Sequence, residues 1–155
     1  MVKIKRILFP LDFSECSYQV LPYALSLAEK YNAEIYLIYV ARDLRYFSGF
    51  HVPHTSISGF IKEVVDAGEK MMDRVCEEHL QSCPSFERRV VVGDPAEEII
   101  KIAESENIDL IVMGTHGRKG LDRTLFGSVA EHVVKNAPVP VLTIKPRKVK
   151  KSEEG

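Results

Sequence analysis

The chain has 155 residues, which is the length of one ordinary domain. Hydrophobic residues make up 45% of the chain and charged residues 28%, a globular composition that excludes a disordered or fibrous chain. The 21 Lys and Arg residues balance 22 Asp and Glu residues, for a formal net charge of −1. This balance gives no general field that would attract nucleic acid or an anionic membrane, so we expect neither as a partner.

No apolar run approaches the roughly 20 residues that a membrane-spanning helix needs. Residues 1–13 start with basic side chains but lack the long apolar stretch and cleavage site of a signal peptide, so we expect a cytoplasmic protein. An odd number of cysteines favours reduced thiols over a disulfide framework. Cys76, His79 and Cys83 have a spacing that zinc sites use, but no further Cys/His pair follows them. We therefore favour packing at a helix end over a metal site.

Short strand-like segments alternate with longer helical ones along the first half of the chain. Residues 4–10 are predicted to form a buried strand, and residues 34–40 a second strand rich in aromatic and branched side chains. Between them, apolar residues recur at helical spacing over residues 14–31, and Pro22 is expected to kink or break the first part of that helix. Residues 41–56 show no clear period and are predicted as a loop.

The second half continues the alternation. Residues 60–76 carry an apolar stripe typical of a long amphipathic helix, and residues 86–92 are predicted as the third strand. Asp94, Pro95 and Glu97 together indicate the start of the next helix. A fourth strand is predicted over residues 108–113, followed by a glycine-bearing loop, a short helix that begins at Gly127 and Ser128, and a fifth strand over residues 139–145.

Strands separated by helices require crossover connections, which favour a parallel sheet covered on both faces. The fold class is therefore predicted as α/β, with an open five-stranded parallel sheet and helices on both faces. Neither an internal repeat nor a linker divides the chain. We expect one domain over residues 1–146 and a charged, flexible tail over residues 147–155, whose basic residues are solvated rather than bound to nucleic acid.

Ligands of open parallel sheets bind beyond the carboxyl ends of the strands. The loop after the predicted fourth strand has the spacing Gly114-x2-Gly117-x9-Gly127-Ser128. Glycines let main-chain N–H groups approach a ligand and permit positive φ, and a helix N-terminus favours an anion. This pattern predicts a phosphate site, although tight turns alone can also explain glycines. It matches neither the Walker loop nor the dinucleotide-binding motif.

The same loop carries an excess of basic residues. Arg118, Lys119 and Arg123, offset by Asp122, give it a formal charge of +2 that could attract phosphates or serve only solubility. His116 is expected to be an exposed loop residue without a catalytic role.

Residues 113–145 resemble the signature of the universal stress protein family, and G-x2-G-x9-G-S is the motif of its ATP-binding branch. The resemblance extends to ILFPLDFSE at residues 7–15 and GDPAEEI at residues 93–99, and it fails only at residues 41–60. It implies the adenine nucleotide alpha hydrolase-like fold with strand order 3-2-1-4-5. It also implies a bound ATP with Mg or Mn on the phosphates, and a homodimer that pairs the last strands, Val139 to Ile144, of two subunits.

The resemblance also implies a role for particular residues. Pro10 and Asp12 would flank the nucleoside, and the backbone of Val40 would meet adenine. The ribose and the first phosphates would lie against Met113, Gly114 and Gly117, and the outer phosphates against Gly127, Ser128 and Val129. From the residues alone, core packing is an alternative for Val40 and Met113, and helix capping is an alternative for Asp12.

The resulting hypothesis is an ATP-binding universal stress protein that acts as a nucleotide-dependent regulatory switch on a downstream protein partner in the stress response, with at most slow ATP hydrolysis. One alternative is a slow ATPase or phosphotransferase in which Asp12 or His116 takes part, because phosphoryl transfer also needs a positioned acceptor. Another is a dimeric adaptor without nucleotide. A phosphoacceptor domain that uses Asp94 is a weaker alternative, because Asp94 is better explained as a helix cap.

Overall fold

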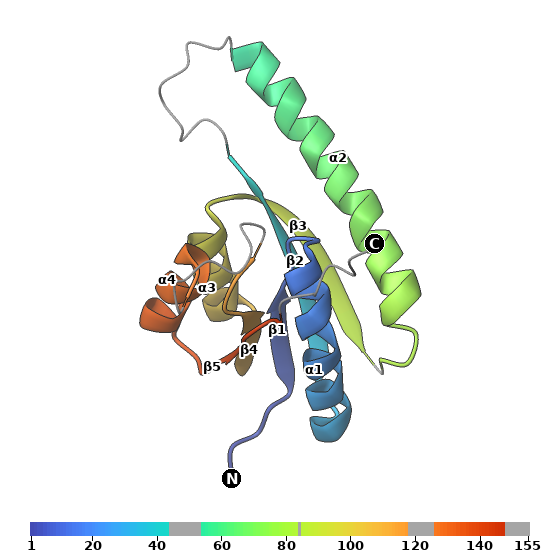
Figure 1. The fold of residues 1–155 in the computed structure, drawn as a ribbon, viewed down its shortest axis with the longest axis vertical. Coiled ribbons are helices and arrows are strands. Elements are labelled where there is room, and N and C mark those ends of the chain that lie inside the picture. The colour runs from blue at the N-terminus through green and yellow to red at the C-terminus, as the bar shows by residue number, and fades with distance from the viewer. Residues whose placement is uncertain (44–53, 84, 118–125, 148–155) are drawn as a thin grey trace, which may run out of the picture.

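The computed structural model describes residues 1–43, 54–83, 85–117 and 126–147 (Figure 1). Strands and helices alternate from β1 to β5. The elements are β1 Arg6–Pro10, α1 Glu15–Tyr31, β2 Glu34–Arg42, α2 His54–His79, β3 Phe86–Gly93, α3 Pro95–Ser105, β4 Leu110–Gly114, α4 Ser128–Asn136 and β5 Val141–Ile144. None of the helices within these residues has the length and apolar character that a membrane crossing requires.

The five strands form one parallel sheet in the order β3-β2-β1-β4-β5, which confirms the predicted fold class and strand order. Helices α1 and α2 cover one face and α3 and α4 the other (Figure 1). Because β1 lies in the middle of the sheet, the chain reverses its direction of progress between β3 and β4. The carboxyl ends of β1 and β4 are therefore neighbours where the connections lead to opposite faces.

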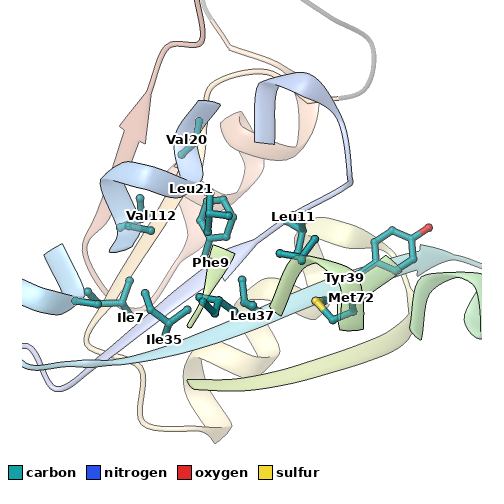
Figure 2. Packing of buried hydrophobic residues seen from close by; sticks show 14 of the residues in the cluster. Ile7, Phe9, Leu11, Val20, Leu21, Ile35, Leu37, Tyr39, Met72 and Val112 are labelled. Carbon is teal, nitrogen blue, oxygen red and sulfur yellow. The ribbon is translucent and has the colours of Figure 1, made fainter. Parts of the chain in front are cut away.

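Side-chain alternation along β1 supplies both cores. Ile7 and Phe9 pack beneath α1 and α2 (Figure 2). Leu8 faces α3 and α4 instead, and all three side chains are fully buried. Full burial of one such side chain contributes about 1.5–3 kcal/mol. A continuous apolar run is thus what a strand covered on both faces requires.

Helix α1 is capped by Ser14, whose side chain accepts a hydrogen bond from the N–H of Ser17. We expected Pro22 to kink or break this helix; the helix runs unbroken from Glu15 to Tyr31 with Pro22 inside it, so the break is wrong. Val20, Leu21 and Ala24 are buried on either side of Pro22, and their packing on the sheet stabilises the turn that lacks one N–H donor. At α3 the local prediction is confirmed: Asp94 caps the helix and accepts from the N–H of Glu97.

The segment predicted as a loop over residues 41–56 contains regular structure at both ends. Strand β2 continues to Arg42, because it pairs with β3 along its whole length up to Gly93. Helix α2 begins at His54, and residues 44–53 lie outside the described residues.

An ionic cluster ties the strands together at the end of the sheet opposite the carboxyl edge. The guanidinium of Arg6 lies 2.7 Å from Glu34, 3.2 Å from Glu87 and 3.5 Å from Glu106, and it also donates to the main-chain oxygen of Glu106 at 2.7 Å. These contacts raise the pKa of Arg6 above its ordinary value, chiefly through the hydrogen bond to Glu34. Arg6 therefore links β1 with β2, β3 and the end of α3.

Candidate functional site

The register of the sheet brings the predicted site residues to one edge. Pro10 of β1 pairs with Ile38 of β2, and Leu8 of β1 pairs with Ile111 of β4. Asp12 and Val40 each lie two residues beyond the Pro10–Ile38 pair, and Gly114 is the last residue of β4, so all three lie near the carboxyl edge of the sheet. Val40 was predicted at the very end of its strand, but β2 extends two residues beyond it.

Asp12 and Gly117 are in direct contact across this edge, although 104 residues separate them in the sequence. A Cβ atom built on Gly117 would lie 2.5 Å from Oδ2 of Asp12, which is closer than real Cβ contacts allow. Only a glycine therefore lets the loop after β4 approach the carboxylate that follows β1. The structure brings these two predicted residues together, and Gly117 itself is exposed.

The other carboxylate oxygen of Asp12 is held by the start of α1. Oδ1 accepts hydrogen bonds from the N–H of Ser14 at 3.0 Å and from the hydroxyls of Ser14 at 2.5 Å and Ser17 at 2.6 Å. Phe13, between them, has a φ of 60°, a left-handed conformation that turns the chain sharply from β1 into α1. Its ring packs on Tyr39 with centroids 4.7 Å apart, which offsets the cost of that conformation.

The second part of the glycine motif is held by Thr115. The N–H of Gly127 donates to the main-chain oxygen of Thr115 at 2.7 Å, and the N–H of Thr115 donates to Ile144 of β5 at 3.0 Å. A Cβ on Gly127 would lie 3.2 Å from that same Thr115 oxygen. The start of α4 is thereby fixed against the loop that leaves β4.

Glycines at these positions are required for close approach and not for unusual dihedral angles. None of Gly114, Gly117 and Gly127 has a φ in the left-handed region that glycine permits. Gly127 is the N-cap of α4 with a φ of −69°, and it offers no side-chain cap. By contrast, the side chains of Ser14 and Asp94 occupy the corresponding positions of α1 and α3. At α4 the N-terminal N–H groups and the positive end of the helix dipole are left uncovered by a capping side chain.

His116 lies inside the loop and is buried, with 6% of its surface exposed, which contradicts the expected surface position. Its Nδ1 lies 2.8 Å from the hydroxyl of Thr115, which is buried to the same extent. A polar pair beneath the loop needs such a mutual hydrogen bond, because burial without one costs free energy. The pair supports the loop from below rather than facing solvent.

Met113 is 5% exposed and belongs to the core beneath α3 and α4. The half-buried side chains of Val40 and Val129 pack against that core. Ser128 is exposed in the first turn of α4, and Pro10 ends β1. The basic residues Arg118, Lys119 and Arg123 lie outside the described residues.

Three contributors to this edge were missed in the sequence. Ser17 holds Asp12 from within α1, Thr115 holds Gly127 by its backbone, and Asp43 is a buried carboxylate just after β2. Asp43 donates its N–H to the main-chain oxygen of Gly93 at 3.4 Å. The serine at the fifth position after Asp12 was a signal available in the sequence, because Asp and Ser side chains bond locally at helix starts.

Two further features define the chemistry nearby. The pKa of Cys16 is raised above its ordinary value by burial and then by the negative charges of Asp12 and Glu15, so its thiol is held in the unreactive, protonated form. Within the described part of the chain, no three His, Cys, Asp or Glu side chains gather as metal ligands. His79, considered as a zinc ligand in the sequence, packs its ring on Tyr18 instead.

This is a doubly wound α/β protein of the adenine nucleotide alpha hydrolase-like class. Three features define it: the strand order, the switch point where β1 and β4 are neighbours, and the glycine-bearing loop after β4. The model of the Universal stress protein family matches residues 3–145, and the chain belongs to that family. It is 39% identical over 143 residues to Universal stress protein MJ0531 of Methanocaldococcus jannaschii, with 91% of this chain and 82% of the relative covered.

Solved structures agree with this assignment. The structure of MJ0577, also from Methanocaldococcus jannaschii, superposes with a TM-score of 0.83 at 31% identity and covers 96% of this chain and 100% of its own. Two more distant structures, both 20% identical, are a universal stress protein in complex with cAMP and one from Archaeoglobus fulgidus in complex with dAMP. Their TM-scores are 0.60 and 0.56, and they cover 92% and 94% of this chain and 98% and 100% of their own.

Proposed function

We propose that this universal stress protein binds ATP at the carboxyl edge between β1 and β4 and acts as a regulatory switch. Its conformation or its affinity for a downstream protein partner then changes with nucleotide occupancy. The carrying observation is the main-chain link from Thr115 to Gly127, which fixes the glycine-capped start of α4 beside the loop after β4. This arrangement aims helix N–H groups at one place, and such groups bind phosphate.

Glycine at two positions brings the loops of the proposed nucleotide site together. A side chain at Gly117 would collide with the carboxylate of Asp12, and one at Gly127 would press on the main-chain oxygen of Thr115. In this proposal Pro10, Asp12 and the backbone of Val40 bind the nucleoside. The phosphates lie against the main chain at Met113, Gly114 and Gly117 and at Gly127, Ser128 and Val129. Solved relatives in complex with cAMP and dAMP support the proposal, because this fold accommodates an adenine nucleotide in those proteins.

A Mg²⁺ or Mn²⁺ ion would accompany the ATP and neutralise part of the phosphate charge. The oxygen donors that this chain offers at the edge are the Ser128 hydroxyl and the Asp12 carboxylate, which suit a hard cation. Ser128 is exposed in the first turn of α4 and is the donor beside the proposed phosphates.

We propose at most slow hydrolysis of the bound ATP. Rapid phosphoryl transfer requires a base or a water-positioning group in addition to a phosphate cradle. Asp12 is engaged by three hydrogen bonds on Oδ1, and His116 is buried against Thr115. Both groups are thus used to hold the loops in place, which favours retention of the nucleotide over turnover.

The switch is proposed to be a homodimer joined through Val139 to Ile144. β5 is an edge strand of the sheet, and Leu142 on it is 40% exposed. The outer side of an edge strand carries main-chain N–H and C=O groups that can pair with another strand. In a two-fold arrangement the same strand of each copy pairs with that of the other. We also propose that the domain extends over residues 1–146 and that residues 147–155 are its tail.

Mass analysis of the ligand released on denaturing the purified protein, followed by calorimetry with ATP and Mg²⁺, tests the proposal. Gly127→Val should abolish ATP uptake, because the branched side chain enters the space at the start of α4. Gly59→Val is the matched control, since a Cβ at Gly59 of α2 meets nothing within 4 Å. A protein that is purified empty and gives no heat with ATP would favour the adaptor. Rapid multiple turnover that Asp12→Ala abolishes would favour the enzyme.

A further inference from the structure

Residues 145–147, which follow β5 and are called the strap below, reach helix α1. The half-buried side chain of Gln19 binds both main-chain groups of Arg147. Its Nε2 donates to the carbonyl oxygen of Arg147 at 3.0 Å, and its Oε1 accepts from the N–H of Arg147 at 2.8 Å. A glutamine amide offers one acceptor oxygen and a donor group, so it pairs with a peptide backbone as a neighbouring strand would.

The middle residue of the strap packs on the candidate site. Pro146 is buried, although it follows the last strand. Its Cγ lies 3.7 Å from the point where a Cβ on Gly114 would stand, and Cγ2 of Val20 lies 3.3 Å from the same point. Gly114 ends β4 and begins the glycine-bearing loop. The strap and α1 therefore both lie against the first residue of that loop.

Main-chain hydrogen bonds continue from the end of β5 to the start of α4. The oxygen of Ile144 accepts from the N–H of Thr115 at 3.0 Å, and the oxygen of Thr115 accepts from the N–H of Gly127 at 2.7 Å. A chain end frays unless it is tied down, and Gln19 supplies such a tie just beyond β5. A continuous series of contacts thus joins Gln19 to both ends of the glycine motif.

The strap has a docked state and a released state of similar free energy. Two hydrogen bonds between neutral groups near the surface favour docking by about tenfold, so the released state is a minor one that is still populated. A ligand shifts such an equilibrium by the ratio of its affinities for the two states. A nucleotide that needs Gly114 and the start of α4 in place binds the docked state more tightly.

We propose that Gln19 is a positioning residue that latches the strap to α1, and that the latch and the nucleotide site stabilise each other. ATP then holds the strap down, and loss of the nucleotide frees the end of the chain for contact with a protein partner. The inference rests on the proposed ATP site and names the element that signals its occupancy. Gln19 acts through the strap and does not itself contact the nucleotide.

Cleavage of the full chain after Arg147 by an arginine-specific protease measures release of the strap. The protease needs the two main-chain groups that Gln19 binds, and with little protease the rate follows the population of the released state. Gln19→Met removes both hydrogen bonds and should speed this cleavage about tenfold. Intact-mass analysis identifies the cleaved bond.

Calorimetry with ATP and Mg²⁺ measures the other side of the coupling. Gln19→Met should weaken ATP binding about fivefold, which is a typical coupling between two sites. Coupling is reciprocal, so saturating ATP should slow the cleavage of wild-type protein after Arg147 by the same factor. A merely structural role of Gln19 does not predict that equality.

Two variants separate the latch from a general loss of structure. Gln81→Met changes an exposed glutamine after α2 and should alter neither cleavage nor affinity. Pro146→Ala keeps the hydrogen bonds of Gln19 but removes packing on Gly114, and it should shift both measurements in the direction of Gln19→Met. Cleavage after Arg88 of β3 reports general unfolding and should stay at the wild-type rate. Synthetic peptides of residues 143–151, with Pro or Ala at position 146, correct for effects on the protease itself.

The contrary outcomes are distinct. Faster cleavage of Gln19→Met with unchanged ATP affinity, or ATP that leaves cleavage unchanged or speeds it, overturns the coupling and leaves the ATP site standing. Cleavage of Gln19→Met at the wild-type rate overturns the latch itself. If the wild-type protein binds no ATP, the proposed function fails and the coupling fails with it.

Discussion

Replacement of Gly117 by alanine tests the contact between the loops after β1 and β4. The added Cβ would lie 2.5 Å from Oδ2 of Asp12, about 0.9 Å inside the 3.4 Å at which ordinary contact begins. Asp12 cannot retreat by that distance and keep the bonds from Ser14 and Ser17 to Oδ1, which are 2.5–3.0 Å long. Hydrogen bonds to a charged group contribute about 1.5–3 kcal/mol each, so we expect unfolding free energy to fall by about 2 kcal/mol.

Urea denaturation measures this loss, and calorimetry should show ATP binding weakened about 30-fold for the same free energy. Gly59→Ala is the matched control, because its Cβ meets nothing and alanine stabilises a helix by up to about 1 kcal/mol relative to glycine. In an Asp12→Ala background the clash is absent, and Gly117→Ala should then cost little. An equal cost in both backgrounds would refute the explanation, since the clash with Asp12 would not be its source.

Three more predictions concern other parts of the molecule. Arg6→Met should lower the unfolding free energy by about 2 kcal/mol, because it leaves three glutamates without their shared partner. Lys101→Met, on the exposed face of α3, is the control. Equal midpoints of urea denaturation for the two variants would contradict the role of Arg6. Asp12→Asn removes a negative charge that raises the pKa of Cys16, so iodoacetamide should alkylate that thiol at lower pH than in the wild type. The alkylation is followed peptide by peptide, and Glu29→Gln is the control. An unshifted pH profile would show that burial alone protects the thiol. Leu142→Asp should convert the proposed homodimer to a monomer in sedimentation velocity, and a wild-type protein that already sediments as a monomer would rule out pairing through β5.

Local signals in the sequence predicted the fold well. The cap, proline and glutamate at the start of α3 are recognisable because all their partners lie within four residues, and the structure confirms them. The alternation of strands and helices likewise predicted a parallel sheet, since parallel strands need crossovers. The order of the strands came from the family signature, because periodicity does not determine which strands are neighbours.

Predictions failed where distant contacts outweigh local preferences. Pro22 is tolerated because the turns on both sides of it pack on the sheet. Strand β2 runs past its apolar segment because β3 offers backbone partners up to Gly93. His116 is buried because Thr115 supplies its hydrogen bond beneath the loop.

The candidate site also combines local features, which the sequence can indicate, with contacts between distant residues, which it cannot. The spacing of Gly114, Gly117 and Gly127 predicts a phosphate site on this segment, and that stays a prediction. In the structure, Gly117 lies close to Asp12 and Gly127 close to Thr115, and neither contact could be predicted from the spacing. The hydroxyl of Ser17 was missed because its importance depends on how the turn at Phe13 folds back, which a sequence pattern does not record.

The backbone of the single residue Thr115 joins strand β5 to the start of α4, because its N–H donates to Ile144 and its oxygen accepts from Gly127. Strand β5 therefore cannot peel from β4 at this point without straining the first turn of α4. Such a shared anchor makes local opening cooperative, so the amide protons of Thr115 and Gly127 should exchange with deuterated solvent at one common rate. The rim of the sheet and the beginning of α4 would then open and close as one unit.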